Sequence, residues 1–162
     1  MRLFIAVDLP KELIKYLFFL QTYFSELNLV NSFHLTLKFL GETKPHFILD
    51  KLNSIKEKPF ELELDELGVF PDKINPKVIW MGIKEQPVLF SLQHKIDSAL
   101  KDYNNNVKFH PHITLARCSD KIMFPKLKIE PMKFTVNEFK LYQSILTIEG
   151  PAYEEIKTFN LS

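Results

Sequence analysis

Cysteine is almost missing from this chain. Cys118 is the one cysteine among 162 residues, so no intramolecular disulfide can form, and a reducing, cytoplasmic setting is expected. Long hydrophobic runs are missing as well, because the apolar stretch at residues 3–7 ends at Asp8 and Pro10. That stretch is far shorter than the roughly 20 apolar residues of a transmembrane helix, and it does not resemble a signal peptide. We therefore expect neither a membrane span nor a secretory leader.

Net charge is also small. Lysine and arginine together number 21, aspartate and glutamate number 20, and the formal charge is +1. This balance argues against a broad basic face that coats nucleic acid, so any contacts with RNA are expected to be few and local. Hydrophobic residues make up 46% of the chain, including 15 phenylalanines, which is enough for a globular core. We expect residues 1–162 to form a single domain and the protein to be a monomer.

Apolar periodicity predicts the same order of elements twice. In the first half we expect a strand, a helix beginning at Pro10 and a second strand, at residues 3–7, 10–27 and 33–40. In the second half we expect the same three elements at residues 78–83, 88–100 and 112–117. The remaining predicted elements are a second helix beginning at Pro45 and strands at residues 60–65 and 156–161. Residues 134–148 are expected to form either two strand segments or one bent strand.

This repeated order predicts an internal duplication, with halves at roughly residues 1–72 and 76–162. Each half supplies strands and one long helix. The predicted fold class is therefore α+β, with two similar lobes that each have a sheet on one side and a helix on the other.

Each half also contains a nearly identical stretch, His34-Leu35-Thr36-Leu37 in the first and His112-Ile113-Thr114-Leu115 in the second. Only five histidines occur in the chain, so chance rarely produces two such pairs. Because side chains alternate between the faces of a strand, the histidine and threonine of each stretch share a face.

Alternation also makes predictions for the residues that follow each threonine. Lys38 is expected on the face of His34. A lysine at a strand edge can either have a functional role or prevent the edge strand from pairing with another chain. Phe39 is expected on the opposite face, which favours core packing over stacking on an unpaired base. Arg117 is expected opposite His112, unless a bulge near the strand end redirects it.

Two imidazoles that face each other across a cleft can move protons in both directions. One can be neutral and accept a proton while the other is charged and donates one. Threonine hydroxyls and an arginine can bind anionic phosphate oxygens. The pair His110 and His112 has no obvious third ligand for a metal ion. The set therefore suits metal-free cleavage of a phosphate diester, with no cofactor.

These residues resemble a known family. The chain is similar to the two-histidine phosphoesterases, in particular the RNA 2′,3′-cyclic phosphodiesterases, also known as 2′-5′ RNA ligases. The two histidine motifs are the specific part of a resemblance that runs nearly end to end. Supporting stretches are Arg2-Leu3-Phe4-Ile5-Ala6, Gly68-Val69-Phe70-Pro71, Val78-Ile79-Trp80, Ser144 and Gly150-Pro151-Ala152-Tyr153.

The resemblance implies a bilobal fold in which antiparallel sheets line a central cleft and helices lie outside. It implies opening of a 2′,3′-cyclic phosphate on an RNA end to a 2′-phosphate and, in some members, joining of RNA pieces through a 2′-5′ bond. By motif position, His34 would protonate the leaving O3′ and His112 would activate water. Thr36, Thr114 and Arg117 would bind the phosphate oxygens.

Two other functions remain open at this stage. The same histidines could act on another small cyclic phosphate, such as an ADP-ribose 1″,2″-cyclic phosphate. Alternatively, the protein could be a non-catalytic module that binds RNA ends. The expected partners are accordingly RNA ends, such as tRNA fragments, or small cyclic nucleotides.

Overall fold

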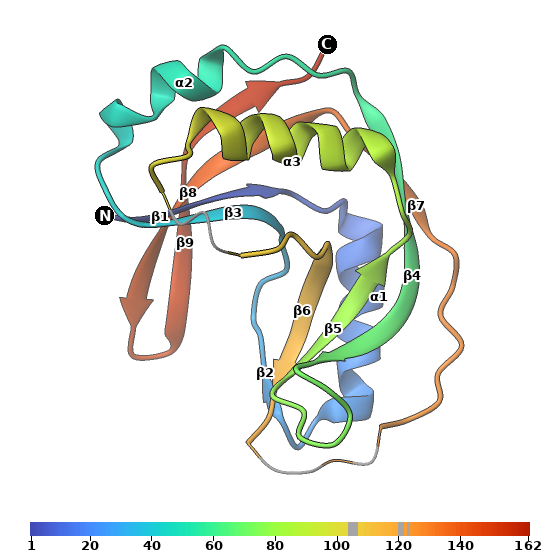
Figure 1. The fold of residues 1–162 in the computed structure, drawn as a ribbon. Coiled ribbons are helices and arrows are strands. Elements are labelled where there is room, and N and C mark those ends of the chain that lie inside the picture. Colours follow the sequence, from blue (N-terminus) through green and yellow to red (C-terminus); the bar gives the residue numbers. More distant parts are fainter. Residues whose placement is uncertain (104–106, 120–121, 123) are drawn as a thin grey trace.

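Two antiparallel sheets form the framework of the computed structural model, which describes residues 1–103, 107–119, 122 and 124–162 (Figure 1). The first sheet has the strand order β3-β1-β8-β9. Its strands are β1 (Arg2–Val7), β3 (Leu35–Glu42), β8 (Glu138–Thr147) and β9 (Gly150–Asn160). The second sheet has the order β2-β6-β5-β4-β7. Its strands are β2 (Asn28–Leu29), β4 (Phe60–Phe70), β5 (Val78–Ile83), β6 (His112–Arg117) and β7 (Lys133–Val136). The predicted α+β class with two antiparallel sheets is confirmed.

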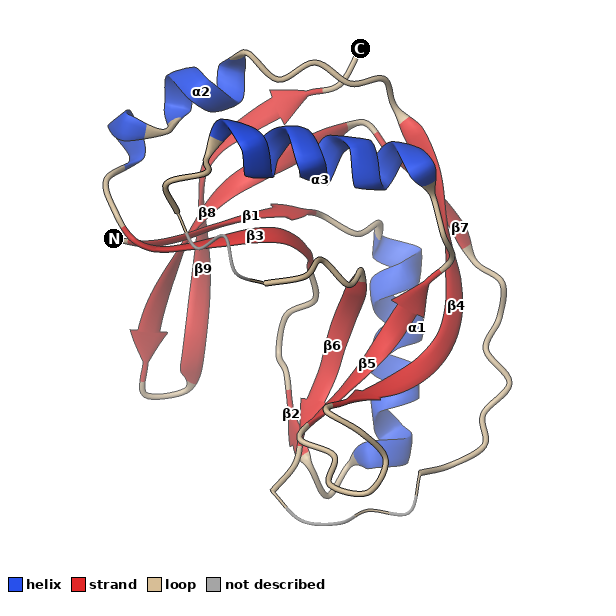
Figure 2. Ribbon diagram, viewed as in Figure 1, coloured by secondary structure: helices blue, strands red, loops and turns tan. Residues whose placement is uncertain are grey.

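The helices lie on the outside of the sheets (Figure 2). They are α1 (Lys11–Gln21), α2 (Leu49–Asn53) and α3 (Pro87–Ala99), with short 3₁₀ turns at Thr22–Phe24 and Pro45–Phe47. Helix α1, from the first half, contacts β6 of the second half, and α3, from the second half, contacts β3 of the first. No helix in the described part of the chain is long and apolar enough to cross a membrane.

The boundary between the sequence halves is not the boundary between the sheets. Strand β4 comes from the first half but lies in the second sheet, while β8 and β9 come from the second half and lie in the first sheet. Strands and helices therefore exchange between the two lobes. The duplication into residues 1–72 and 76–162 stays a prediction from the order of elements.

The first helix is shorter than its apolar periodicity suggests. It ends at Gln21 instead of near residue 27. Phe24 and Leu27 are apolar for another reason, because they pack with Ile79 and Ala116 of the second sheet. Their helical spacing is therefore coincidental.

The strands differ from the prediction mainly in length. Strand β4 continues to Phe70 and not only to residue 65, and β9 begins at Gly150, well before residue 156. The predicted strand region 134–148 is divided into β7 and β8, as one of the expected alternatives had it. The two-residue strand β2 had no sequence signal.

One hydrophobic core passes through both sheets. It contains Leu3 and Ile5 from β1 together with Met81 from β5 and Ile113 from β6, each 1% exposed or less. Full burial of an aliphatic side chain contributes about 1.5–3 kcal/mol. The two lobes therefore share their largest source of stability.

Candidate active site

A β-bulge follows the first His-x-Thr motif. Strand β3 pairs with β1 so that Thr36 is opposite Ala6 and Lys38 is opposite Ile5, which leaves Leu37 without a partner. An extra residue of this kind reverses the alternation of the side chains that follow it, here Lys38 and Phe39, up to a second register shift at Leu40. The bulge therefore determines which side chains after Thr36 point to the cleft.

This bulge overturns the predicted orientations of Lys38 and Phe39. The Lys38 side chain is 4% exposed, and its Nζ lies 2.5 Å from Oδ1 of Asp97 on helix α3. The prediction that Lys38 shares the face of His34 is wrong. Phe39, predicted to face the core, is instead 58% exposed and lines the cleft.

A second bulge lies at the same place in the second motif. Strand β6 pairs with β5 so that Thr114 is opposite Trp80 and Ala116 is opposite Ile79, which leaves Leu115 unpaired. Beyond this bulge Arg117 is exposed and lines the cleft. The redirection of Arg117 by a bulge is confirmed, and Arg117 takes the position that Phe39 has in the first motif.

The second bulge is held in place by a buried side chain of helix α1. The Nε2 group of Gln21 donates hydrogen bonds to the carbonyls of Leu115 and Val30, both at 2.9 Å. The backbone N–H of Val30 donates to the same Leu115 carbonyl at 3.1 Å. Gln21 is only 4% exposed, so these hydrogen bonds give buried backbone carbonyls at the bulge the partners that they need.

The two motifs meet at one cavity of about 880 Å³. Every predicted site residue except His112 and Lys38 lines it, namely His34, Thr36, Phe39, Thr114 and Arg117. His112 pairs in regular register with its neighbours up to Thr114, so both side chains lie on the same face of β6. The structure therefore brings together residues that are far apart in the sequence.

The decisive comparison is with known families. The model of the 2′-5′ RNA ligase superfamily matches residues 16–145, which is most of the chain. The chain belongs to the 2′-5′ RNA ligase superfamily. The RNA 2′,3′-cyclic phosphodiesterase of Archaeoglobus fulgidus is 31% identical to it over 98% of this chain and 99% of the relative. The protein of that name from Escherichia coli is 30% identical over 99% and 97% of the two chains.

Solved structures of related proteins have the same fold. Escherichia coli LigT complexed with 3′-AMP superposes with a TM-score of 0.87 at 28% identity, over 99% of this chain and 98% of LigT. A protein from Thermus thermophilus superposes with a TM-score of 0.83 at 30% identity, over 99% and 97% of the two chains. The family expected from the two histidine motifs is confirmed.

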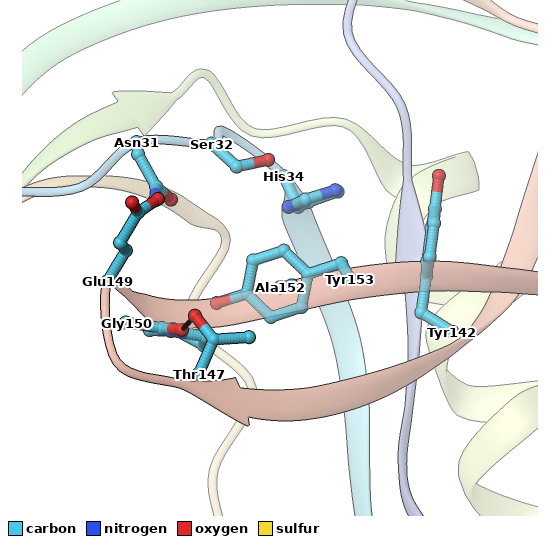
Figure 3. A pocket seen from close by; sticks show the side chains of 10 residues that line it. Asn31, Ser32, His34, Tyr142, Thr147, Glu149, Gly150, Ala152 and Tyr153 are labelled. Atoms are coloured by element: carbon cyan, nitrogen blue, oxygen red, sulfur yellow. Dashed lines mark hydrogen bonds between the residues drawn. The ribbon is translucent and has the colours of Figure 1, made fainter.

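His34 of this superfamily member lies in an aromatic setting. Its ring centroid is 5.1 Å from that of Tyr142, 5.0 Å from that of Tyr153 and 5.9 Å from that of Phe4, each in an edge-on arrangement. Figure 3 shows His34 beside Ser32, with Tyr153 of the β8–β9 hairpin across a smaller pocket. Contacts on several sides restrict the imidazole to few orientations.

A carboxylate lies behind this aromatic group. The Tyr142 hydroxyl donates a hydrogen bond to Asp8, and Asp8 also forms an ion pair with Lys140 at 2.9 Å. Burial lowers the pKa of the His34 imidazole, while the negative charge of Asp8 opposes this by raising it. Burial also raises the pKa of Tyr142, so its hydroxyl stays protonated as a donor.

His112 has a different environment. Its ring lies 4.9 Å from that of Phe70 and 6.1 Å from that of Trp80, and its Nδ1 is 2.6 Å from the His110 carbonyl oxygen. A carbonyl can only accept, so Nδ1 carries the proton and Nε2 is left as the basic nitrogen. Burial lowers the pKa of His112; the bond to the His110 carbonyl raises it, and the positive charges of His110 and Arg117 lower it.

The two imidazoles therefore differ in the charge that surrounds them. Burial favours the neutral form of both imidazoles, but the Asp8 carboxylate opposes this at His34, whereas the positive charge of Arg117 adds to it at His112. Such a pair can donate a proton on one side of a phosphate and accept one on the other. Within the part of the chain that the structure describes, no three His, Cys, Asp or Glu side chains cluster as they would around a metal ion.

Asp8, Tyr142 and Tyr153 were not predicted as site residues. Tyr153 lies in the Gly150-Pro151-Ala152-Tyr153 stretch that supports the family resemblance. That stretch was the sequence signal from which Tyr153 could have been predicted as a site residue. Asp8 had no signal, because it looked like a residue that simply ends the first strand.

Proposed function

We propose that this protein opens 2′,3′-cyclic phosphates on RNA ends to 2′-phosphates. The observation that carries the proposal is the meeting of both His-x-Thr strands at one cavity that also contains Arg117. The relatives named RNA 2′,3′-cyclic phosphodiesterase support the choice of reaction.

In the proposed mechanism, Nε2 of His112 takes a proton from water while the water oxygen attacks phosphorus. The bond from phosphorus to O3′ breaks, and His34 gives its proton to O3′, which leaves a 2′-phosphate and a 3′-hydroxyl. Thr36, Thr114 and Arg117 bind the phosphate oxygens as charge develops on them. Each proton-transfer role is typically worth about 10²–10⁴-fold in rate.

The same site can join RNA pieces if a 5′-hydroxyl replaces water as the nucleophile, which yields a 2′-5′ bond. The superfamily's name supports this reaction as a second activity. Because both motifs come from one chain, the site is complete without a partner subunit, which supports a monomer. The lone Cys118 is consistent with action in the cytoplasm.

A small cyclic phosphate, such as an ADP-ribose 1″,2″-cyclic phosphate, is the second candidate substrate. The cavity of about 880 Å³ falls within the size range of small-molecule sites, and this observation favours a small cyclic phosphate as a candidate substrate. Only the base and sugar contacts would differ, because the same histidines serve both reactions.

The deciding experiment uses a short RNA that ends in a 2′,3′-cyclic phosphate, incubated with excess EDTA. The natural protein is compared with His34→Ala and His112→Ala, and with His94→Ala on helix α3 as a matched control outside the cavity. We expect a 2′-phosphate product from the natural protein and the control, and a loss of at least about 100-fold in each site variant.

Other results would change the conclusion. A 3′-phosphate product would contradict the proposed mechanism. Turnover that survives both site substitutions would remove the two histidines from the reaction. Turnover of ADP-ribose 1″,2″-cyclic phosphate but not of RNA would favour the second candidate.

A further inference from the structure

Strands β8 and β9 run past the edge of the sheet that supports them. Strand β1 pairs with β8 only as far as Ser144, whereas β8 and β9 continue to pair up to Thr147 and Gly150. Residues 145–152, here called the hairpin arm, therefore form a ribbon of two strands without a third. Figure 1 shows this ribbon projecting away from the rest of the sheet. A ribbon of two strands alone is marginally stable at best. A contribution to the stability of the fold therefore does not account for the presence of the arm.

Large apolar side chains are exposed on this arm. Leu146 is 87% exposed, and Ile148, in the turn itself, is fully exposed. Hairpin turns of two residues are normally occupied by Asn, Asp or Gly, because these tolerate the backbone and face water. Apolar groups left exposed next to a cavity are typical of a binding surface.

Leu146 and Pro151 of the arm lie on the face that contacts His34. Tyr142 and Leu146 both lie on β8, an even number of residues apart, and Leu146 is directly opposite Pro151 of β9. Side chains that are paired, or two apart, share a face. Because Tyr142 and Tyr153 contact His34 on this face, Leu146 and Pro151 continue it outward. Both also line the cavity of about 880 Å³.

We propose that the hairpin arm holds the unpaired ribonucleotides that lead to the cyclic phosphate, with Leu146 and Pro151 against base faces. This rests on the proposed function and adds a feature that selects RNA strands over mononucleotides. The faces of unpaired bases are apolar and accessible, whereas those in a duplex are stacked. The turn also contains Glu149, whose charge disfavours phosphates there. The arm is therefore suited to contact bases and not the RNA backbone.

The test compares kcat/KM on three substrates. They are a mononucleoside 2′,3′-cyclic phosphate, a single-stranded oligoribonucleotide with the same cyclic end, and that oligonucleotide annealed to a complement flush with its end. The variant is Leu146→Ser. Ile74→Ser is the matched control, because Ile74 is 76% exposed on another loop and does not line the cavity.

We expect Leu146→Ser to lower kcat/KM on the single-stranded oligonucleotide by ~3–10-fold, somewhat less than the loss of an aromatic stacking contact. A mononucleotide has no preceding base that could reach the arm, so its turnover by this variant is expected to fall by a smaller factor, and every rate of the control is expected to stay unchanged. The natural protein is expected to prefer the single strand over the duplex, and Leu146→Ser to reduce that preference.

Two results would overturn the arm's role. One is an equal loss on the mononucleotide and the oligonucleotide, since that would mean the arm acts through His34. The other is no loss on either substrate. If the natural protein turns over nothing, the proposed function fails, and the arm is then tested by binding. Fluorescence anisotropy with a labelled single-stranded RNA ending in a 3′-phosphate would have to show weaker binding by Leu146→Ser than by Ile74→Ser, or the arm's role fails as well.

Discussion

At the scale of single residues, the two imidazoles share the largest influence on their pKa values and differ in the charges near them. Burial lowers the pKa of both His34 and His112 from the ordinary value of 6.5. The Asp8 carboxylate partly opposes this at His34, whereas Arg117 lowers the pKa of His112 further. A base must be neutral and an acid must be protonated, so kcat/KM rises through the pKa of the base and falls through that of the acid. We expect both limbs of this bell-shaped profile to lie below pH 6.5.

Replacing Asp8 with Asn tests the assignment of the acid. Without the carboxylate, the pKa of His34 falls further, so His34 loses its proton at a lower pH. We expect the alkaline limb of the kcat/KM profile to move to lower pH, while the acid limb stays in place. Glu155→Gln is the control, because Glu155 contacts the same Lys140 but is not the charge that acts on His34. If only the acid limb moves, His34 is the base and the two roles are reversed.

Lys38 and Phe39 are adjacent residues with opposite expected effects. Lys38→Met removes a hydrogen-bonded ion pair with Asp97, and we expect a loss of about 1–3 kcal/mol in the free energy of unfolding. Because Lys38 points away from the cavity, kcat/KM is expected to stay within ~2-fold, since surface and core changes outside a site act mainly on stability.

Phe39→Ala is the complementary change. Phe39 is mostly exposed, so its loss is expected to alter stability by no more than ~0.5 kcal/mol. We expect kcat/KM on RNA to fall by ~5–100-fold, the range for loss of a base-stacking aromatic. Urea denaturation and initial rates measure both variants. A drop in activity for Lys38→Met with unchanged stability would contradict the orientation that the bulge imposes.

At the scale of elements, the packing of β4 on β5 supports His112. Gly68 of β4 is opposite Trp80 of β5, and a Cβ at position 68 would lie 2.2 Å from Cη2 of Trp80. The indole ring in turn lies 4.9 Å from the ring of His110 and 6.1 Å from that of His112. The glycine therefore makes room for an aromatic ring next to the proposed base.

Gly68→Ala is expected to displace Trp80. Overpacking of this kind costs about 1–3 kcal/mol of stability, and the shift of Trp80 should also lower kcat/KM. Emission from the single tryptophan of the chain reports the displacement. Adding Trp80→Phe removes the clashing part of the ring, so the double variant is expected to regain stability in chemical denaturation. No regain would show that the close contact is not the cause.

At the scale of the whole molecule, the shared core makes the lobes one unit of unfolding. Buried residues of β1 and β3 belong to the same hydrophobic cluster as those of β5 and β6, and α1 and α3 each contact the sheet of the other half. We expect a single calorimetric transition whose van't Hoff and calorimetric enthalpies agree. Two separable transitions would mean that the lobes are independent domains.

How much of this could be predicted depends on the range of the interactions involved. Strands β1, β5 and β6 were predicted within a residue, because alternation and apolar runs act over a few neighbouring residues. The ends of α1 and β4 were not, because the residues after Gln21 pack on distant strands and the residues of β4 beyond position 65 are held by pairing with β5. The orientation of Lys38 and Phe39 failed for the same reason, since pairing with β1 creates the bulge at Leu37.

The sequence by itself determined the family, the two histidine motifs and the α+β class, because these depend on residue types and short-range periodicity. Only the tertiary structure decided how those parts combine. It places Asp8, Tyr142 and Tyr153 around His34, and it directs Phe39 and Arg117 into the cleft. The physical reason is that strand pairing and side-chain packing join residues far apart in the chain, and no local pattern encodes which of them meet.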